Sequence, residues 1–94
     1  MSRHYELKIK GYYLQRIATR AANIFQIDID AIFSPGRQRP IVNARSLTCF
    51  WAARELGISL SELARTYKMS VPGIGYAVVR GEEIAKNNNL SLVI

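Results

Sequence analysis

The sequence predicts an all-α fold, a compact helical bundle that contains a helix-turn-helix. Apolar residues recur every three or four positions over 13–26 and over 41–56, which is the spacing of an amphipathic helix. Two later segments each open on a serine, Ser59 and Ser70, that is placed to cap the start of a helix. Of the 94 residues, 49% are hydrophobic and 21% are charged, so we expect one folded domain rather than a disordered chain.

Residues 4–10, "HYELKIK", open the chain with an alternating pattern. Tyr5, Leu7 and Ile9 are separated by polar residues, as in a half-exposed strand. We therefore expect residues 1–12 to form a short extended arm.

The first predicted helix covers about residues 13–26. Its apolar side is formed by Leu14, Ile17, Ala18, Ala21, Ile24 and Phe25, and these residues recur with helical spacing. Asp28 follows this helix. Its carboxylate is expected to cap a short helical turn over 29–33, because it can accept hydrogen bonds from the free N–H groups there.

The segment "SPGRQRP", residues 34–40, has the composition of a loop. The tip of this loop carries three polar side chains, Arg37, Gln38 and Arg39. Pro40 suits the first turn of the next helix, where a backbone N–H has no partner within the helix. That helix is predicted over 41–56, and it carries a further cation, Arg45.

A capping box marks the start of the next helix. Ser59 is expected to accept a hydrogen bond from the backbone N–H of Glu62, and Ile58 is expected to pack on Leu63. Gly57 fits the left-handed position that commonly ends the preceding helix. The sequence therefore predicts a short helix beginning near residue 60.

The segment "MSVPGIGYAVVRG", residues 69–81, fits two patterns. Ile74, Tyr76 and Val78 alternate as in a strand, whereas the apolar residues at helical spacing are Ile74, Ala77, Val78 and Gly81. The helix is favoured because Ser70 can cap it and Pro72 falls in its first turn, where proline is tolerated. We expect this helix to cover 71–86 and to end near the three asparagines that follow.

The last two predicted helices and the turn between them form a helix-turn-helix. Lys68 stands in the turn, where many such motifs have glycine. In a DNA-binding motif of this kind, the second helix enters the major groove by its N-terminal end. The residues that would then face DNA are Ser70, Val71, Pro72, Gly73, Gly75, Tyr76, Val79 and Arg80. Helix pairs with this spacing also occur as plain structure.

Two of these outward residues, Gly73 and Gly75, have two interpretations. Glycine removes side-chain bulk where the backbone must approach DNA closely. It also permits tight packing between two helices, and the sequence does not choose between these explanations.

The charge pattern favours double-stranded DNA as the partner. The net charge is +6, and nine of the thirteen cations are arginine, which suits phosphate and base edges. Acidic residues are absent between Asp30 and Glu55 and again between Glu62 and Glu82. We therefore add five of the seven cations of these two stretches to the candidate DNA-binding residues, namely Arg37, Arg39, Arg45, Lys68 and Arg80, with Gln38 between the first two.

Patterns typical of other functions are missing. Apolar runs are too short to span a membrane, and the single cysteine, Cys49, suits a reducing cytoplasm. No cluster of metal ligands or nucleophile–base pair is visible, so we expect no enzyme activity, no cofactor and no metal site in this chain. The alternative function is protein interaction, in which Val71, Tyr76 and Val79 form a docking or homodimer surface.

The order of elements over residues 13–86 resembles the C-terminal DNA-binding domain of the bacterial replication initiator DnaA. The resemblance rests on "SPGRQRP", "IVNARSLTCFWAARELG" and "ISLSELARTYKMSVPGIGYAVVRGEEIA". It implies a fold related to the Trp repressor, with a basic-loop arginine in the minor groove. The initiator family opens its reading helix with an Asp-His-Thr-Thr-Val type motif, whereas this chain has "SVPGI" at 70–74.

The stretches "GRQRPIVNARSL", "RELGISLSELA" and "MSVPGIGYAVVRGE" are more similar to the DnaA-like domains at the C-terminus of bacterial insertion-sequence transposases. That resemblance implies a DNA-targeting module whose catalytic domain lies upstream of this chain. The remaining residues, 87–94, form a tail that ends in the apolar "LSLVI". This tail is expected to pair with the N-terminal arm, to fold back on the core, or to continue into further sequence.

Overall fold

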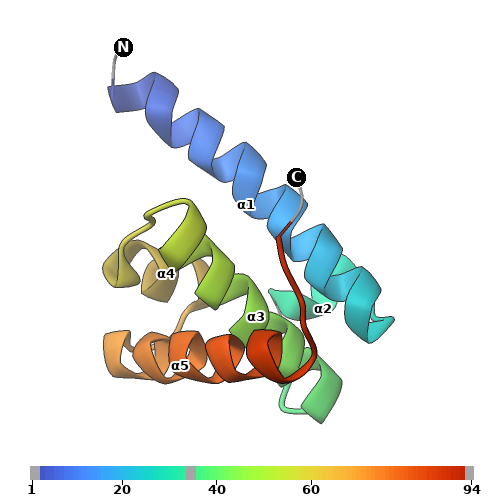
Figure 1. Ribbon diagram of the computed structural model, residues 1–94. Coiled ribbons are helices and arrows are strands. Elements are labelled where there is room, and N and C mark those ends of the chain that lie inside the picture. The colour runs from blue at the N-terminus through green and yellow to red at the C-terminus, as the bar shows by residue number, and fades with distance from the viewer. Residues whose placement is uncertain (1–2, 34–35, 93–94) are drawn as a thin grey trace.

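The computed structural model describes residues 3–33 and 36–92, and these residues form five helices and no strand (Figure 1). The helices are α1 (Arg3–Phe25), α2 (Ile29–Ile32), α3 (Arg39–Glu55), α4 (Leu60–Tyr67) and α5 (Val71–Asn87). The predicted all-α bundle with a helix-turn-helix is therefore confirmed. None of the helices in the described ranges is long and apolar enough to cross a membrane.

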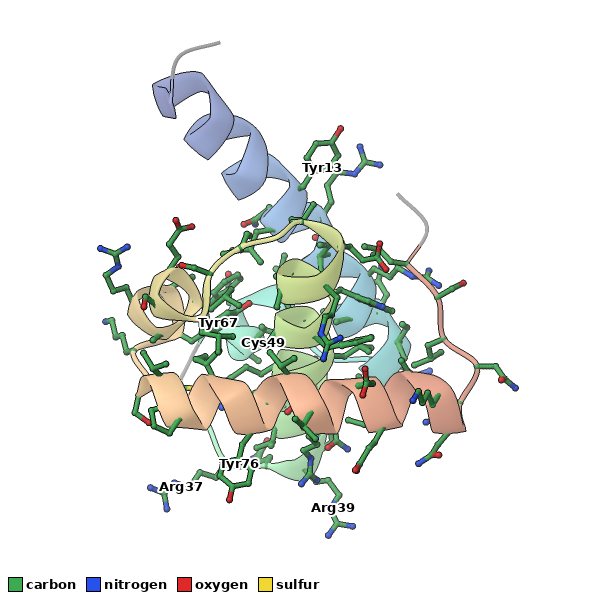
Figure 2. All side chains as sticks on the ribbon, turned by 60° about the vertical axis from the view of Figure 1, so that its left-hand side comes forward. Tyr13, Arg37, Arg39, Cys49, Tyr67 and Tyr76 are labelled. Carbon is green, nitrogen blue, oxygen red and sulfur yellow. The ribbon has the colours of Figure 1, made fainter. Side chains whose placement is uncertain are left out.

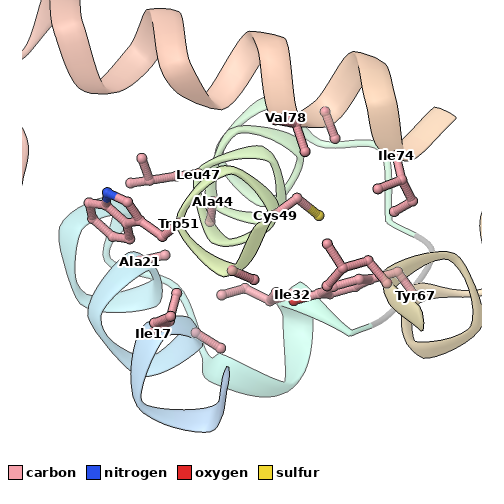
Figure 3. Close-up of a cluster of buried hydrophobic side chains, with 14 of the residues drawn as sticks. Ile17, Ala21, Ile32, Ala44, Leu47, Cys49, Trp51, Tyr67, Ile74 and Val78 are labelled. Atoms are coloured by element: carbon pink, nitrogen blue, oxygen red, sulfur yellow. The ribbon is translucent and has the colours of Figure 1, made fainter. Parts of the chain in front are cut away.

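Helix α3 is the centre of the bundle. It packs against α1 and α2 on one side and against α5 on the other, while α4 packs on α5. Figure 3 shows buried side chains from the surrounding helices converging on α3. The largest fully buried side chains are Trp51, Ile17, Ile32, Leu47, Leu63, Ile74, Thr48 and Cys49. Burying these apolar groups is the main source of stability in so small a domain.

The extended arm predicted for residues 4–10 is wrong. Helix α1 begins at Arg3, and its N-terminal part projects beyond the rest of the bundle (Figure 1). A strand needs a neighbouring strand to satisfy its backbone, and the described residues contain none. Extending the helix that already exists over 13–25 gains one hydrogen bond for each residue fixed. The helical conformation of residues 4–10 is therefore more stable than the extended one.

The other element boundaries follow the predicted caps closely. Gly57 has a φ of +68°, the left-handed conformation expected after α3. Helix α3 begins at Arg39, two residues earlier than predicted. Arg39 therefore lies in the first turn of the helix, and Gln38 is the N-cap. Asp28 does occupy the N-cap of α2, but its side chain makes no capping hydrogen bond.

The C-terminal tail folds back on the core, which was one of the three alternatives. Leu90 and Leu92 pack against the buried cluster. The Arg20 guanidinium donates from Nε and Nη2 to the Ser91 carbonyl oxygen at 3.2 and 2.9 Å. The same guanidinium lies 5.8 Å from the centre of the Trp51 ring, so one arginine joins the tail to α1 and α3.

Helix α5 approaches α3 closely where the two cross at Gly81. A Cβ atom on Gly81 would overlap the Ser46 carbonyl oxygen and would lie 2.7 Å from Cβ of Phe50. Gly81 is buried, so its missing side chain lets the two backbones meet. Gly75, by contrast, would place a Cβ in open space.

We expect Gly81→Ala to destabilise the domain by about 1–3 kcal/mol, because backbone atoms must move to admit the methyl group. Gly75→Ala is the matched control in the same helix. It is expected to stabilise the domain by up to about 1 kcal/mol, since alanine is the better helix former and meets no neighbour. Urea unfolding of the three proteins measures both effects. Equal effects of the two substitutions would contradict the proposed crossing.

Two ionisable side chains, Cys49 of α3 and Tyr67 of α4, are buried in the core. Burial raises the pKa of the Cys49 thiol from 9.0 to about 12, and the charge of Arg45 only partly offsets this. Burial also raises the pKa of the Tyr67 phenol, and the neighbouring Cys49 adds to that rise. The Tyr67 ring stacks on Phe33, with 5.4 Å between the ring centres. Both groups are therefore held neutral as parts of the apolar core.

The raised pKa of Cys49 predicts an alkaline loss of stability. Between pH 9 and 12 the unfolded thiol loses its proton while the folded thiol keeps it, so the free energy of unfolding falls as the pH rises. At pH 10 this contribution should reach about 1.4 kcal/mol. Urea unfolding at pH 7 and pH 10 should show that the wild-type protein loses more stability than Cys49→Ala, in which burial still raises the pKa of Tyr67. Identical losses would contradict the prediction.

Candidate nucleic-acid interface

The helix-turn-helix is formed by α4, the turn over residues 68–70, and α5. Ser59 Oγ accepts a hydrogen bond from the Glu62 N–H at 3.1 Å, which confirms the predicted cap of α4. Ser70 Oγ accepts from the Gly73 N–H at 3.1 Å and caps α5 in the same way. Both caps satisfy N–H groups that a helix start leaves without a partner.

Lys68 sets the shape of the turn. Its φ and ψ are 55° and 45°, the left-handed conformation that glycine adopts without strain. The Met69 N–H donates to the Ala64 carbonyl oxygen at 2.9 Å and closes the turn. The turn thus keeps the geometry that glycine would give, while the exposed lysine adds a cation between the two helices.

The outward side of α5 is exposed as the sequence predicts. Tyr76 is 83% exposed, Val79 55% and Val71 43%, which is unusual for side chains of this size. Ser70, Pro72 and Arg80 are also exposed, whereas Gly73 and Gly75 are partly covered. The opposite side of the helix is buried at Ile74, Ala77, Val78, Gly81 and Ala85.

The start of α3 lies beside this side of α5. Arg80 donates from Nε and Nη2 to Asn43 Oδ1 at 3.3 and 3.2 Å. Tyr76 stands four residues before Arg80 on α5, and Arg39 stands four residues before Asn43 on α3, so each pair shares a helix face. Figure 2 shows Arg37, Tyr76 and Arg39 projecting on one side of α5. We call the surface formed by Arg37, Arg39, Asn43, Tyr76 and Arg80 the α3–α5 face.

Asn43 was not among the residues that the sequence suggested. It lies 37 positions before Arg80, and neither its type nor its spacing marks it as a partner. Only the crossing of α3 and α5 brings the two side chains together. The amide oxygen of Asn43 holds the guanidinium in place without neutralising its charge.

Arg45, a candidate DNA-binding residue, makes contacts within the protein. Its guanidinium donates from Nε to the Ile32 carbonyl oxygen at 3.1 Å and from Nη2 to the Gly36 carbonyl oxygen at 3.0 Å. These bonds fasten the segment that leads into α3 and carries Arg37. Arg45 therefore acts as a positioning residue for that segment.

The two helix starts beside this face carry no acidic residue. Helices α3 and α5 have no acidic residue in the first turn, whereas α2 and α4 carry Asp30 and Glu62 there. The acids of α5 begin only at Glu82, which lies 3.8 Å from the Arg54 guanidinium at the other end of α3. The N-terminal ends of α3 and α5 thus keep the positive end of the helix dipole unopposed by carboxylates.

Among the residues that the structure describes, no group of histidine, cysteine, aspartate or glutamate side chains could hold a metal ion. The described titratable groups with clearly raised pKa values, Cys49 and Tyr67, both lie in the core. The α3–α5 face instead offers three cations, an amide and a phenol, a combination suited to binding a surface.

The left-handed backbone of Lys68 predicts a trade-off between stability and charge. We expect Lys68→Gly to raise the free energy of unfolding by about 1 kcal/mol, because glycine adopts this conformation without steric cost. The same change removes a cation from the turn. Thermal unfolding of Lys68→Gly beside Lys68→Ala separates the two effects, since alanine also removes the charge but keeps the steric cost. A glycine variant no more stable than the alanine variant would contradict this account.

Comparison with known proteins yields one informative relative. The chain is 24% identical over 76 residues to the chromosomal replication initiator protein DnaA of Pseudothermotoga lettingae. The match covers 81% of this chain but only 17% of that protein, so the chain spans about a sixth of the relative's length. No family model matches the chain. No solved structure matches it either. This weak similarity supports a DnaA-like domain and agrees with the resemblance found in the sequence.

Proposed function

We propose that this domain binds double-stranded DNA. The reading helix, residues 71–86, enters the major groove by its N-terminal end, and the basic segment 36–40 lies on the backbone or in the adjacent minor groove. The observation that carries this proposal is the α3–α5 face. It joins the exposed start of a helix-turn-helix reading helix to three arginines, and the first turns of α3 and α5 carry no carboxylate.

The N-terminus of α3 is better suited to bind phosphate than the N-terminus of α5. A helix N-terminus offers unpaired N–H groups and a positive dipole to an anion. At α5 the Ser70 side chain uses the Gly73 N–H, and Pro72 has no N–H to offer. At α3 the first turn carries Arg39, and no side-chain cap occupies the N-terminus. We therefore assign α3 with Arg37 and Arg39 to the phosphates, and α5 to the groove.

The similarity to DnaA supports an inference about the kind of protein to which this domain belongs. DnaA is named as a chromosomal replication initiator, and the matched region is a small part of it. We infer that the present domain is the DNA-targeting module of an initiator-like or transposase-like protein, whose other activities reside in other domains. It acts in the cytoplasm, where the target DNA of such a bacterial protein would lie.

A second candidate function is protein interaction or homodimerisation through α5. The exposed side chains of Val71, Tyr76 and Val79 favour it, because large apolar groups in water often mark a contact surface. The positive border of the same face favours DNA over an apolar partner. Sedimentation equilibrium without DNA distinguishes the two, since only the second function predicts a mass that rises with protein concentration.

DNA binding predicts a specific salt effect. We expect the triple variant Arg37→Ala, Arg39→Ala and Arg80→Ala to bind duplex DNA more weakly. Its negative slope of log K against log salt should become shallower by about 2.7 if each arginine contacts one phosphate. Fluorescence anisotropy with a labelled duplex at several salt concentrations measures both quantities.

The matched control removes the same charge elsewhere, through Arg16→Ala, Arg54→Ala and Lys86→Ala. Its affinity should fall much less, because these residues lie outside the α3–α5 face. If both triple variants bind equally well, binding follows net charge alone and the proposed face is incorrect.

A further inference from the structure

We propose that α5 recognises the C5-methyl groups of pyrimidines in the major groove. This inference rests on the proposed DNA-binding function and specifies what the reading helix detects. It starts from the chemistry of the outward side of α5, which is apolar where readers of base edges usually carry polar side chains.

The outward residues form a continuous apolar stripe along α5. Pro72, Gly75, Tyr76 and Val79 stand at i, i+3, i+4 and i+7, so they share one side of the helix. This side lies opposite the buried residues that include Ile74 and Gly81. At a rise of 1.5 Å per residue the stripe is about 10 Å long, which matches about three base-pair steps. We call these four residues the outer stripe.

The polar side chains beside the outer stripe have other partners. Ser70 Oγ accepts the Gly73 N–H at 3.1 Å as the helix cap. The Arg80 guanidinium is held by Asn43 Oδ1 through two hydrogen bonds. These bonds occupy an acceptor site of Ser70 and two donors of Arg80, whereas the ring of Tyr76 and the methyl groups of Val79 are exposed to solvent.

The outer stripe lacks a side chain at Gly75. A Cβ on Gly75 would meet no protein atom within 4 Å, so packing between helices does not explain this glycine. Packing does explain Gly81, whose Cβ would overlap α3. The missing side chain at 75 leaves open space on the outer stripe between Pro72 and Val79, and a projecting methyl group would fit there.

The major groove carries such methyl groups. Thymine presents its C5-methyl group there, and apolar side chains recognise it by contact. Methylated cytosine presents the same group at the same ring position. The arginines beside the outer stripe are complementary to the phosphates that border a groove, which favours duplex DNA over an apolar protein as the occupant.

The test compares duplexes that differ only in this methyl group. One 20-base-pair duplex contains thymine, the second contains uracil at every thymine position, and the third carries 5-methylcytosine in the uracil duplex. We expect the wild-type protein to bind the uracil duplex about fourfold more weakly for each methyl group contacted, the factor that corresponds to about 0.8 kcal/mol for one buried CH₂ group. Competition anisotropy with the full chain measures the ratio of affinities.

Substitutions show whether the outer stripe causes this preference. Val79→Ala and Tyr76→Ala should lower the thymine-to-uracil ratio toward one. Leu60→Ala is the matched control, because Leu60 is an apolar side chain of α4 that is 37% exposed and lies off the outer stripe. All three changes are at exposed positions, and circular dichroism verifies that each variant is folded.

Each outcome decides between the proposals. Equal binding of the thymine and uracil duplexes overturns methyl recognition but leaves duplex binding in place. A preference that persists unchanged in Val79→Ala and Tyr76→Ala overturns it too, because DNA shape would then be the cause. Absence of duplex binding overturns the proposed function itself, and this inference with it. Recovery with the third duplex assigns recognition to both methylated pyrimidines, and lack of recovery assigns it to thymine.

Discussion

The contact between α3 and α5 at Gly81 determines how the rest of the molecule is arranged. The two backbones meet there without an intervening side chain, since a Cβ on Gly81 would overlap the Ser46 carbonyl oxygen. This close approach buries one side of α5 completely and turns the opposite side to solvent. It also brings Arg80 to Asn43, so the same crossing that packs the core assembles the α3–α5 face.

The α3–α5 face combines a backbone that is held in place by hydrogen bonds with side chains that are exposed to solvent. Arg45 ties down the segment before α3 through two backbone carbonyl groups, and the Ser70 cap fixes the start of α5. The side chains left in solvent, such as Tyr76 at 83% exposure, contribute little to folding. Such an arrangement places groups for binding in advance, so that association does not have to order the backbone.

Local chemistry explains which predictions from the sequence were correct. The caps at Ser59 and Ser70 and the left-handed Gly57 depend on neighbours within a few residues, and the structure confirms each of them. The extended arm at 4–10 was wrong, because alternation alone cannot supply the neighbouring strand that an extended segment needs. The sequence did not decide among the three alternatives for the tail at 87–94, because the partner of the tail, Arg20, lies far away in the first helix.

The sequence by itself determined the helices from residue 13 onward, the caps at Ser59 and Ser70 and the stripe of exposed residues on α5, since these follow from spacing along one chain segment. Tertiary structure decided which glycine is needed for packing, Gly81 rather than Gly75, because that depends on how closely α3 approaches. It also decided that Arg45 binds backbone carbonyls while Arg80 is held at the surface by Asn43. An arginine can reach many partners, and only the folded arrangement of the helices selects one.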